Sequence, residues 1–221
     1  MVTKIFENKK HVFWQALFLT VMFFFLGMVL GIYFEQMRAD KTNVLFYNSE
    51  NSLYDSFALA QLLDKPFVSC EDLVNANINF ADRIYIEARE LENYDSSNKL
   101  TDSLKSIHKK YDLLRTLLWM NVISVKEKCD SVDTVVYLYN YEEEDIELKS
   151  RQVVWGRILN DLKEKEGSEI ILIPIAVDQG VESLNYLLKT YGVRDFPAVL
   201  INEETALYEH ETVEELEDYL N

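Results

Sequence analysis

The chain has 221 residues, of which 48% are hydrophobic, and only 6 Gly and 3 Pro, a composition that suits packed helices and excludes a disordered chain. The net charge of −16 is concentrated in residues 131–221, which carry 7 Lys or Arg against 21 Asp or Glu. Such an acidic surface repels phosphate backbones and anionic headgroups, so no nucleic acid is expected as a partner.

After a short tail at residues 1–11, residues 12–34 are predicted to form a transmembrane helix. This stretch has no charged residue, and at about 1.5 Å per residue it spans roughly 34 Å, enough for a hydrocarbon core of about 30 Å. A cleaved signal peptide is the competing interpretation. The apolar run is longer than a typical signal core, however, and no A-x-A-like cleavage site follows it. We therefore expect an uncleaved single-pass anchor in contact with membrane lipid.

The charges that flank this helix predict its orientation. Lys4, Lys9 and Lys10 precede it and are opposed only by Glu7, whereas the charges just beyond it balance. The positive-inside rule then places the tail in the cytoplasm and residues 35–221 on the extracytoplasmic side of a cell membrane.

Gly27 and Gly31 form a GxxxG motif inside the anchor. The motif is typical of transmembrane helices that dimerise, but it is also common by chance in apolar helices. A homodimer through these glycines and a solitary anchor are both compatible with the sequence.

Residues 35–68 are predicted to be a juxtamembrane segment with one short helix, which Asn51 or Ser52 caps and Pro66 stops. Ser69 and Asp72 then form a capping-box-like start for a long helix over 69–93. A second long helix is predicted over 99–128, after a polar break at 93–98.

Both long helices carry an apolar stripe with heptad spacing, so residues 69–130 are predicted to form an antiparallel, coiled-coil-like helical hairpin. The stripe of the first helix is Leu73, Phe80, Ile84, Ala88 and Leu91, and that of the second is Leu100, Leu104, Ile107, Tyr111, Leu114, Leu118 and Val125.

Cys70 and Cys129 lie at nearly equal distances along the chain from the predicted turn, so both fall at the open end of the hairpin. Outside the cytoplasm such a pair tends to be oxidised, and we expect a disulfide between them. The alternative is two unrelated buried thiols. The spacing is not C-x-x-C, so neither a redox motif nor a zinc site is indicated.

From residue 131 the pattern changes to short β-branched runs alternating with amphipathic segments. The predicted order is β-α-β-α-β-β-α, an α/β layer with one antiparallel strand pair. The strands are expected at 134–139, 169–177, 197–201 and 206–209, and the helices at 150–165, where Ser150 is the N-cap, at 181–191 and after the cap Thr212.

The run from Tyr191 to Ile201, which contains Phe196-Pro197-Ala198, resembles the helix end, turn and cis-proline strand of the thioredoxin-like family. The element order of residues 131–221 agrees with that family. The resemblance implies a thioredoxin-like domain in which the Phe196–Pro197 peptide is cis and borders a peptide-binding groove.

The family's C-x-x-C motif is absent, because this sequence has Lys149-Ser150-Arg151-Gln152 at the corresponding place and no cysteine after Cys129. Residues 141–148 also lengthen the loop before that helix. Thiol–disulfide exchange on this domain is therefore excluded. No nucleotide-binding motif is present, and the three histidines have no ligand spacing, so we expect no enzyme, no cofactor and no metal site.

Three functions are compatible with these features. The first is a redox-inactive, extracytoplasmic binding or scaffold module with a protein or peptide partner at Phe196 and Pro197. The second is a thiol–disulfide redox protein that uses Cys70 and Cys129. The third is a structural subunit of a membrane complex.

Overall fold

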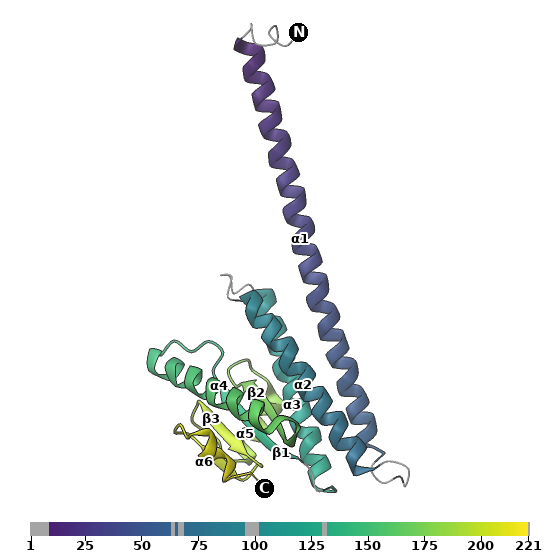
Figure 1. The fold of residues 1–221 in the computed structure, drawn as a ribbon, viewed down its shortest axis with the longest axis vertical. Helices are drawn as coiled ribbons and strands as arrows, with labels where there is room; N and C mark the ends of the chain where they lie inside the picture. Colours follow the sequence, from purple (N-terminus) through teal and green to yellow (C-terminus); the bar gives the residue numbers. More distant parts are fainter. Residues whose placement is uncertain (1–8, 63–64, 66–68, 96–101, 130–131, 221) are drawn as a thin grey trace. The chain divides into compact units, whose positions relative to one another are not determined.

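The computed structural model describes residues 9–62, 65, 69–95, 102–129 and 132–220. They fall into two compact units, Met1–Leu45, the anchor unit, and Phe46–Asn221, the C-terminal unit (Figure 1). The elements in chain order are α1 (Lys9–Ala60), α2 (Cys70–Asp95), α3 (Asp102–Lys126), β1 (Asp133–Tyr139), α4 (Ile146–Glu166), the short 3₁₀ helix η1 (Gly167–Glu169), β2 (Ile170–Ala176), α5 (Glu182–Thr190), β3 (Ala198–Ile201), β4 (Thr205–Leu207) and α6 (Val213–Glu217).

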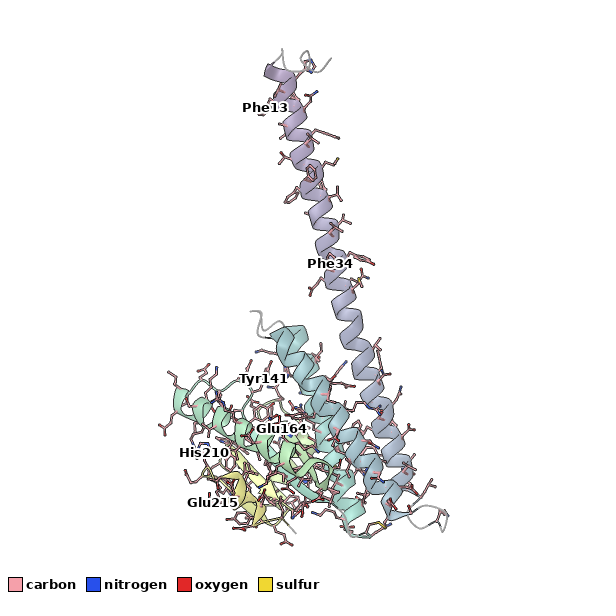
Figure 2. The ribbon with its side chains drawn as sticks, in the orientation of Figure 1. Phe13, Phe34, Tyr141, Glu164, His210 and Glu215 are labelled. Atoms are coloured by element: carbon pink, nitrogen blue, oxygen red, sulfur yellow. A yellow bond between two sulfur atoms is a disulfide. The ribbon has the colours of Figure 1, made fainter. Side chains whose placement is uncertain are left out.

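Helix α1 contains the apolar stretch, which Phe13 and Phe34 mark in Figure 2. Its segment His11–Met37, 27 residues with none of it buried, is long and apolar enough to cross a membrane. Gly27 and Gly31 lie on this segment, and a Cβ atom added at either position would meet nothing within 4 Å. Helix α1 begins at Lys9, before the predicted start of the transmembrane helix at residue 12.

The separate short helix predicted within residues 35–68 is wrong, because α1 continues unbroken to Ala60. Neither Gly nor Pro occurs between Gly31 and Pro66, so nothing local ends the helix. The side chain of Ser52 does not cap a helix start but donates a hydrogen bond to the carbonyl oxygen of Asn48, at 3.0 Å, as a residue inside a helix does. Pro66 lies outside the described residues.

The α2–α3 hairpin is confirmed as an antiparallel pair. Asn121 of α3 donates a hydrogen bond to Asn77 of α2, and Tyr111 of α3 donates one to Glu87 of α2. A step of ten residues forward along α2 therefore matches a step of ten residues backward along α3, as in an antiparallel pair. At the open end the predicted Cys70–Cys129 disulfide is present, with the Cα atoms 5.7 Å apart (Figure 2).

The start of α2 and most of the predicted stripe agree with the sequence analysis. Ser69 caps α2, since its Oγ accepts from the Asp72 N–H at 3.1 Å and Asp72 accepts in return from the Ser69 hydroxyl. Of the stripe, Leu73, Phe80, Ile84, Tyr111, Leu114, Leu118 and Val125 are buried, and Ile107 packs against the core. The side chains of Ala88, Leu91, Leu100 and Leu104, and the turn at 96–101, lie outside the described part.

The α/β elements form one four-stranded mixed sheet in the predicted element order. The strand order is β2-β1-β3-β4, in which β1 and β2 are parallel and β3 is antiparallel to both β1 and β4. Alternation along β1 directs Val136 and Leu138 to one face of the sheet, and Val135 and Tyr137 to the other. The sheet therefore has two buried faces and needs helices on both.

Helix α4 begins four residues earlier than predicted, at Ile146. Its N-cap is Asp145, whose carboxylate accepts from the N–H groups of Glu147 and Leu148, and not Ser150, whose hydroxyl donates to the Ile146 carbonyl oxygen at 2.8 Å. Aspartate is a strong N-cap, and Asp145 precedes Ser150 along the chain, so the helix starts at the earlier cap. The loop expected over residues 141–148 is shorter as a result. By contrast, Thr212 caps α6 as predicted, in a capping box with Glu215.

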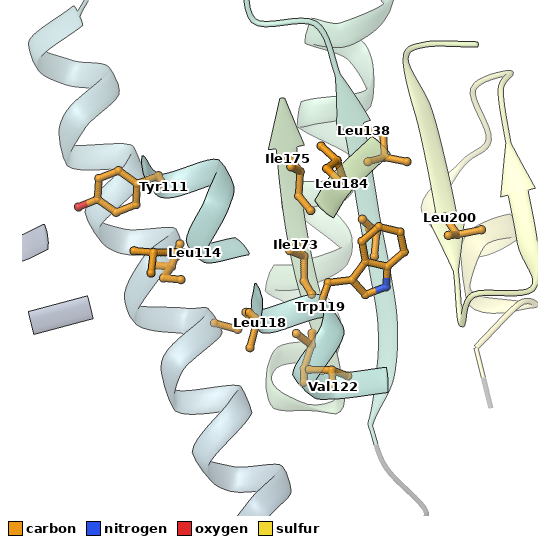
Figure 3. Packing of buried hydrophobic residues seen from close by; sticks show 14 of the residues in the cluster. Tyr111, Leu114, Leu118, Trp119, Val122, Leu138, Ile173, Ile175, Leu184 and Leu200 are labelled. Atoms are coloured by element: carbon orange, nitrogen blue, oxygen red, sulfur yellow. The ribbon is translucent and has the colours of Figure 1, made fainter. Parts of the chain in front are cut away.

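The hairpin and the α/β elements share one core, so the two domains expected on either side of residue 130 are one compact unit. The hairpin and α5 cover one face of the sheet, where Leu53 of α1 joins the same buried cluster, and α4 and α6 cover the other. Figure 3 shows part of the first cluster, in which Trp119 of α3 lies among Ile173 and Leu138 of the strands and Leu184 of α5, whereas Tyr111 and Leu114 of α3 lie away from the strands.

Candidate functional site

The Phe196–Pro197 peptide is cis and directly precedes β3. Pro197 is buried, and Phe196 is half-buried against the main core on the hairpin side of the sheet. A small hollow of about 310 Å³ reaches Phe196 from the α5 side, lined also by Asn185, Leu188, Lys189, Gly192, Val193 and Arg194. Pro197 lines neither this hollow nor the larger groove described next.

A larger groove of about 670 Å³ lies on the opposite side of the sheet, between α4 and the strands β1 and β2. Helices α2 and α3 contribute one wall residue each, Tyr85 and Arg115. The remaining lining residues are Tyr137, Tyr139, Lys149, Gln152, Val153, Gly156, Arg157, Leu159, Asn160, Asp161, Leu172 and Pro174. We call this site the α4 groove.

The floor of the α4 groove is aromatic and apolar. Tyr137 and Tyr139 point to the same face because they are two positions apart on β1, and their rings stack with centroids 5.3 Å apart. The hydroxyl of Tyr137 donates to the Gln152 carbonyl oxygen at 3.0 Å. Burial, with a smaller effect of Tyr139, raises the pKa of Tyr137, so its hydroxyl stays protonated.

Pro174 forms the part of the floor next to the sheet edge, where it pairs with Tyr137 in the parallel register. β2 is an edge strand, and proline has no N–H to leave unpaired there. Two positions further along the same edge, Ala176 donates its N–H to the Asp112 carboxylate of α3 at 3.1 Å. This edge is therefore closed to a further strand at both positions, and a ligand meets the groove through side chains.

The cations of α4 divide into two sets. Three of them interact within the fold: Arg151 with the Tyr208 carbonyl oxygen, Lys163 with Asp82, and Lys165 with Glu217. The other two, Lys149 and Arg157, line the α4 groove and have no hydrogen-bond or ion-pair partner among the described residues. Asp161 is the acidic residue of the lining.

Arg115 brings a third cation to the groove, and it is buried. Its side chain is 7% exposed and makes one hydrogen bond among the described residues, from Nη1 to Asp112 Oδ1 at 3.3 Å. Its Nε is buried with no partner. Burial raises the pKa of Asp112 to about 6, an effect larger than the opposing influence of the Arg115 charge.

Gly156 lies in the middle of α4 and lines the groove. A Cβ atom at this position would meet nothing within 4 Å, and its φ is not in the left-handed region. Glycine inside a helix costs about 1 kcal/mol relative to alanine. Neither the backbone nor the packing of the described residues requires this glycine, and its effect is to widen the groove.

No protein-family model, curated protein or solved structure matches the chain. Within the described residues no group of three or more His, Cys, Asp or Glu side chains is placed to hold a metal ion.

Sequence reasoning did not find the α4 groove, although two signals pointed to it. Lys149 and Arg157 are eight positions apart on one side of a helix in the most acidic part of the chain. Arg115 directly follows Leu114 of the apolar stripe, and an arginine beside a buried stripe is unusual.

Proposed function

We propose that the chain is a membrane-anchored, redox-inactive, thioredoxin-like binding module whose C-terminal unit lies outside the cytoplasm and holds its partner at the α4 groove. The thioredoxin-like assignment is supported by the element order and by the pairing of the strands, with β1 and β2 parallel and β3 and β4 antiparallel. The single observation that carries the binding role is the α4 groove itself. It is a formed cavity whose two α4 cations have no partner among the described residues, in a strongly acidic unit.

A redox role receives less support. No cysteine occurs after Cys129, so the α/β elements have no thiol chemistry. Cys129 is 5% exposed and packs with Leu73 and Val125, an environment in which an attacking thiolate has little access to its sulfur. This burial protects the sulfur of Cys129 and so favours a structural disulfide over an exchangeable one, whereas Cys70 at the start of α2 is exposed.

The extracytoplasmic location is supported by the lysine-rich flank before α1 and by the Cys70–Cys129 disulfide, a bond typical of oxidising compartments. Protease treatment of intact cells is expected to digest the C-terminal unit. Full protection, in cells whose other extracytoplasmic proteins are cut, would place the unit in the cytoplasm.

Photo-crosslinking in native membranes tests the binding role. Val153 lines the α4 groove and is 51% exposed, so a photoreactive phenylalanine at this position reports on an occupant. Tyr186 on α5, on the other side of the sheet and 71% exposed, is the matched control. We expect a discrete crosslinked product from position 153 that position 186 does not give.

Charge variants make the test specific. The double variant Lys149→Gln with Arg157→Gln should remove the product, and Lys189→Gln with Arg194→Gln, the same charge change at the hollow near Phe196, should leave it. No product from position 153 contradicts the proposal. Equal products from 153 and 186 favour a structural subunit that is packed on several sides.

A further inference from the structure

The α4 groove is cationic within an acidic unit. Its lining has Arg115, Lys149 and Arg157 against Asp161, whereas residues 131–221 as a whole carry 21 acidic against 7 basic residues. Arg115 is paired with Asp112, but Lys149 and Arg157 have no partner among the described residues, and like charges that line one cavity repel one another. Their convergence on a cavity is what an anionic ligand requires.

Arg115 supplies an independent indication. A buried guanidinium has five N–H donors to satisfy, and leaving a buried donor unpaired is costly. In the described structure Nη1 reaches Asp112, while Nε is buried without a partner. The side chain lines the groove, and among the described residues Nη2 makes no hydrogen bond, so this end of the guanidinium is the one that can meet a ligand. A planar guanidinium in this state matches the two oxygens of a carboxylate or a phosphate.

The other walls of the groove suit an apolar body attached to the anion. Tyr137, Tyr139, Leu172 and Pro174 form a continuous apolar surface on the strands, and the volume of about 670 Å³ is in the range of ligand cavities. Val153 lines the opposite wall on α4, and Gly156 leaves room beside it.

From this geometry we propose that the α4 groove binds an oxyanion, a carboxylate or a phosphate, which Arg115, Lys149 and Arg157 hold while the aromatic or apolar body of the ligand packs on Tyr137 and Tyr139. This inference rests on the proposed binding function of the same groove and adds the chemical class of the ligand. Arg115 is the specificity residue, because its charge is fixed in place by burial, whereas Lys149 and Arg157 are exposed and attract the anion to the entrance.

Calorimetric titration of the full chain in uncharged detergent tests the proposal with three probes: N-acetyl-L-phenylalanine, phenyl phosphate and the neutral N-acetyl-L-phenylalaninamide. We expect at least one of the two anions to bind at least about tenfold more tightly than the amide, since hydrogen bonds to charged groups contribute roughly 1.5–3 kcal/mol. The tighter anion identifies the source as carboxylate or phosphate. Raising the salt concentration should weaken the binding of the anion but not that of the amide.

Matched charge variants locate the site. Lys149→Gln with Arg157→Gln should weaken the binding of the anion about tenfold, and Lys189→Gln with Arg194→Gln should leave it within about twofold. All four residues are exposed, so neither pair threatens the fold. Equal binding of the amide and the anions overturns the oxyanion proposal but leaves the groove as a binding site. The oxyanion proposal is also overturned if no probe binds at about 10 mM, or if the two double variants lose the same amount of affinity for the anion. The crosslinking result at Val153 tests the binding function separately.

Discussion

Different helices pack on the two faces of the sheet, and the candidate site lies on the face where the helices leave a groove. On one face the hairpin and α5 close over the strands, and their buried side chains form one core that Leu53 of α1 joins. On the other face α4 and α6 pack on the sheet but leave the α4 groove beside β2. The hairpin borders this groove through Tyr85 and Arg115, so a segment outside the α/β elements contributes to the shape and charge of the groove.

The largest effect we expect is from loss of the disulfide, and it tests whether the two faces unfold together. Replacing both Cys70 and Cys129 by Ser frees a loop of about sixty residues in the unfolded chain and should lower the free energy of unfolding by about 4 kcal/mol, or the melting temperature by about 10 °C. Because the clusters around Trp119 on α3 and Trp155 on α4 pack on opposite faces of the same sheet, both tryptophans should report one transition, measured by their fluorescence in a Trp14→Phe background.

A reducing agent should lower the melting temperature of the chain with both cysteines but not that of the double serine variant, which controls for other effects of reduction. Two separate transitions, with Trp119 in the lower one and Trp155 unaffected, would show that the hairpin is a domain of its own.

Asp112, which closes the edge of β2 beside the groove, should make stability depend on pH. Its pKa is raised to about 6 in the folded state from 3.8, so between these values the folded chain holds a proton that the unfolded chain has lost. The stabilisation is complete below about pH 4 and is lost as the pH rises through about 6, on the order of 3 kcal/mol in total. Denaturant unfolding of the protein and of the Asp112→Asn variant between pH 4 and pH 7 measures how steeply the free energy of unfolding of each changes with pH. Parallel curves for the two proteins would contradict the raised pKa.

The tryptophans compare the two faces directly, because both are fully buried. Trp119 Nε1 donates to Glu203 at 2.9 Å, whereas Trp155 Nε1 has no partner among the described residues. Replacement by Phe should therefore cost about 2 kcal/mol more at Trp119 than at Trp155, since a hydrogen bond to a charged group is lost only on the hairpin face. Urea unfolding of the two variants gives the comparison, and equal costs would mean that the Glu203 bond contributes nothing.

The smallest effect is a gain. Gly156→Ala should raise the free energy of unfolding by about 0.5–1 kcal/mol, because α4 gains helix propensity and the new methyl group meets no neighbour. Gly192→Ala is the matched control, since space is equally open there but φ is +71°, which alanine adopts only with strain, and this change should destabilise. If both variants change the free energy of unfolding in the same direction, the difference in backbone conformation between the two positions does not determine the effect of alanine.

Several features were predictable because their causes are local. The apolar composition of residues 12–34 predicts a spanning helix without reference to other elements. Heptad spacing predicts the α2–α3 pair, and the pairing of Cys70 with Cys129 follows from it. Ser69 and Thr212 were correct as caps because each satisfies N–H groups two or three positions along the same chain.

Other features were decided by contacts between segments far apart in sequence. Asn51 and Ser52 predicted the start of a separate short helix, yet α1 continues, and the burial of its Leu53 in the core of the C-terminal unit is a tertiary contact. The sequence by itself determined the apolar helix, the clamped hairpin and the order of the strands and helices along the chain. Only the tertiary structure decided that the hairpin lies on the sheet and brings Arg115 to the cations of α4, because burial and the pairing of charges depend on which surfaces meet, and no spacing along the chain encodes that.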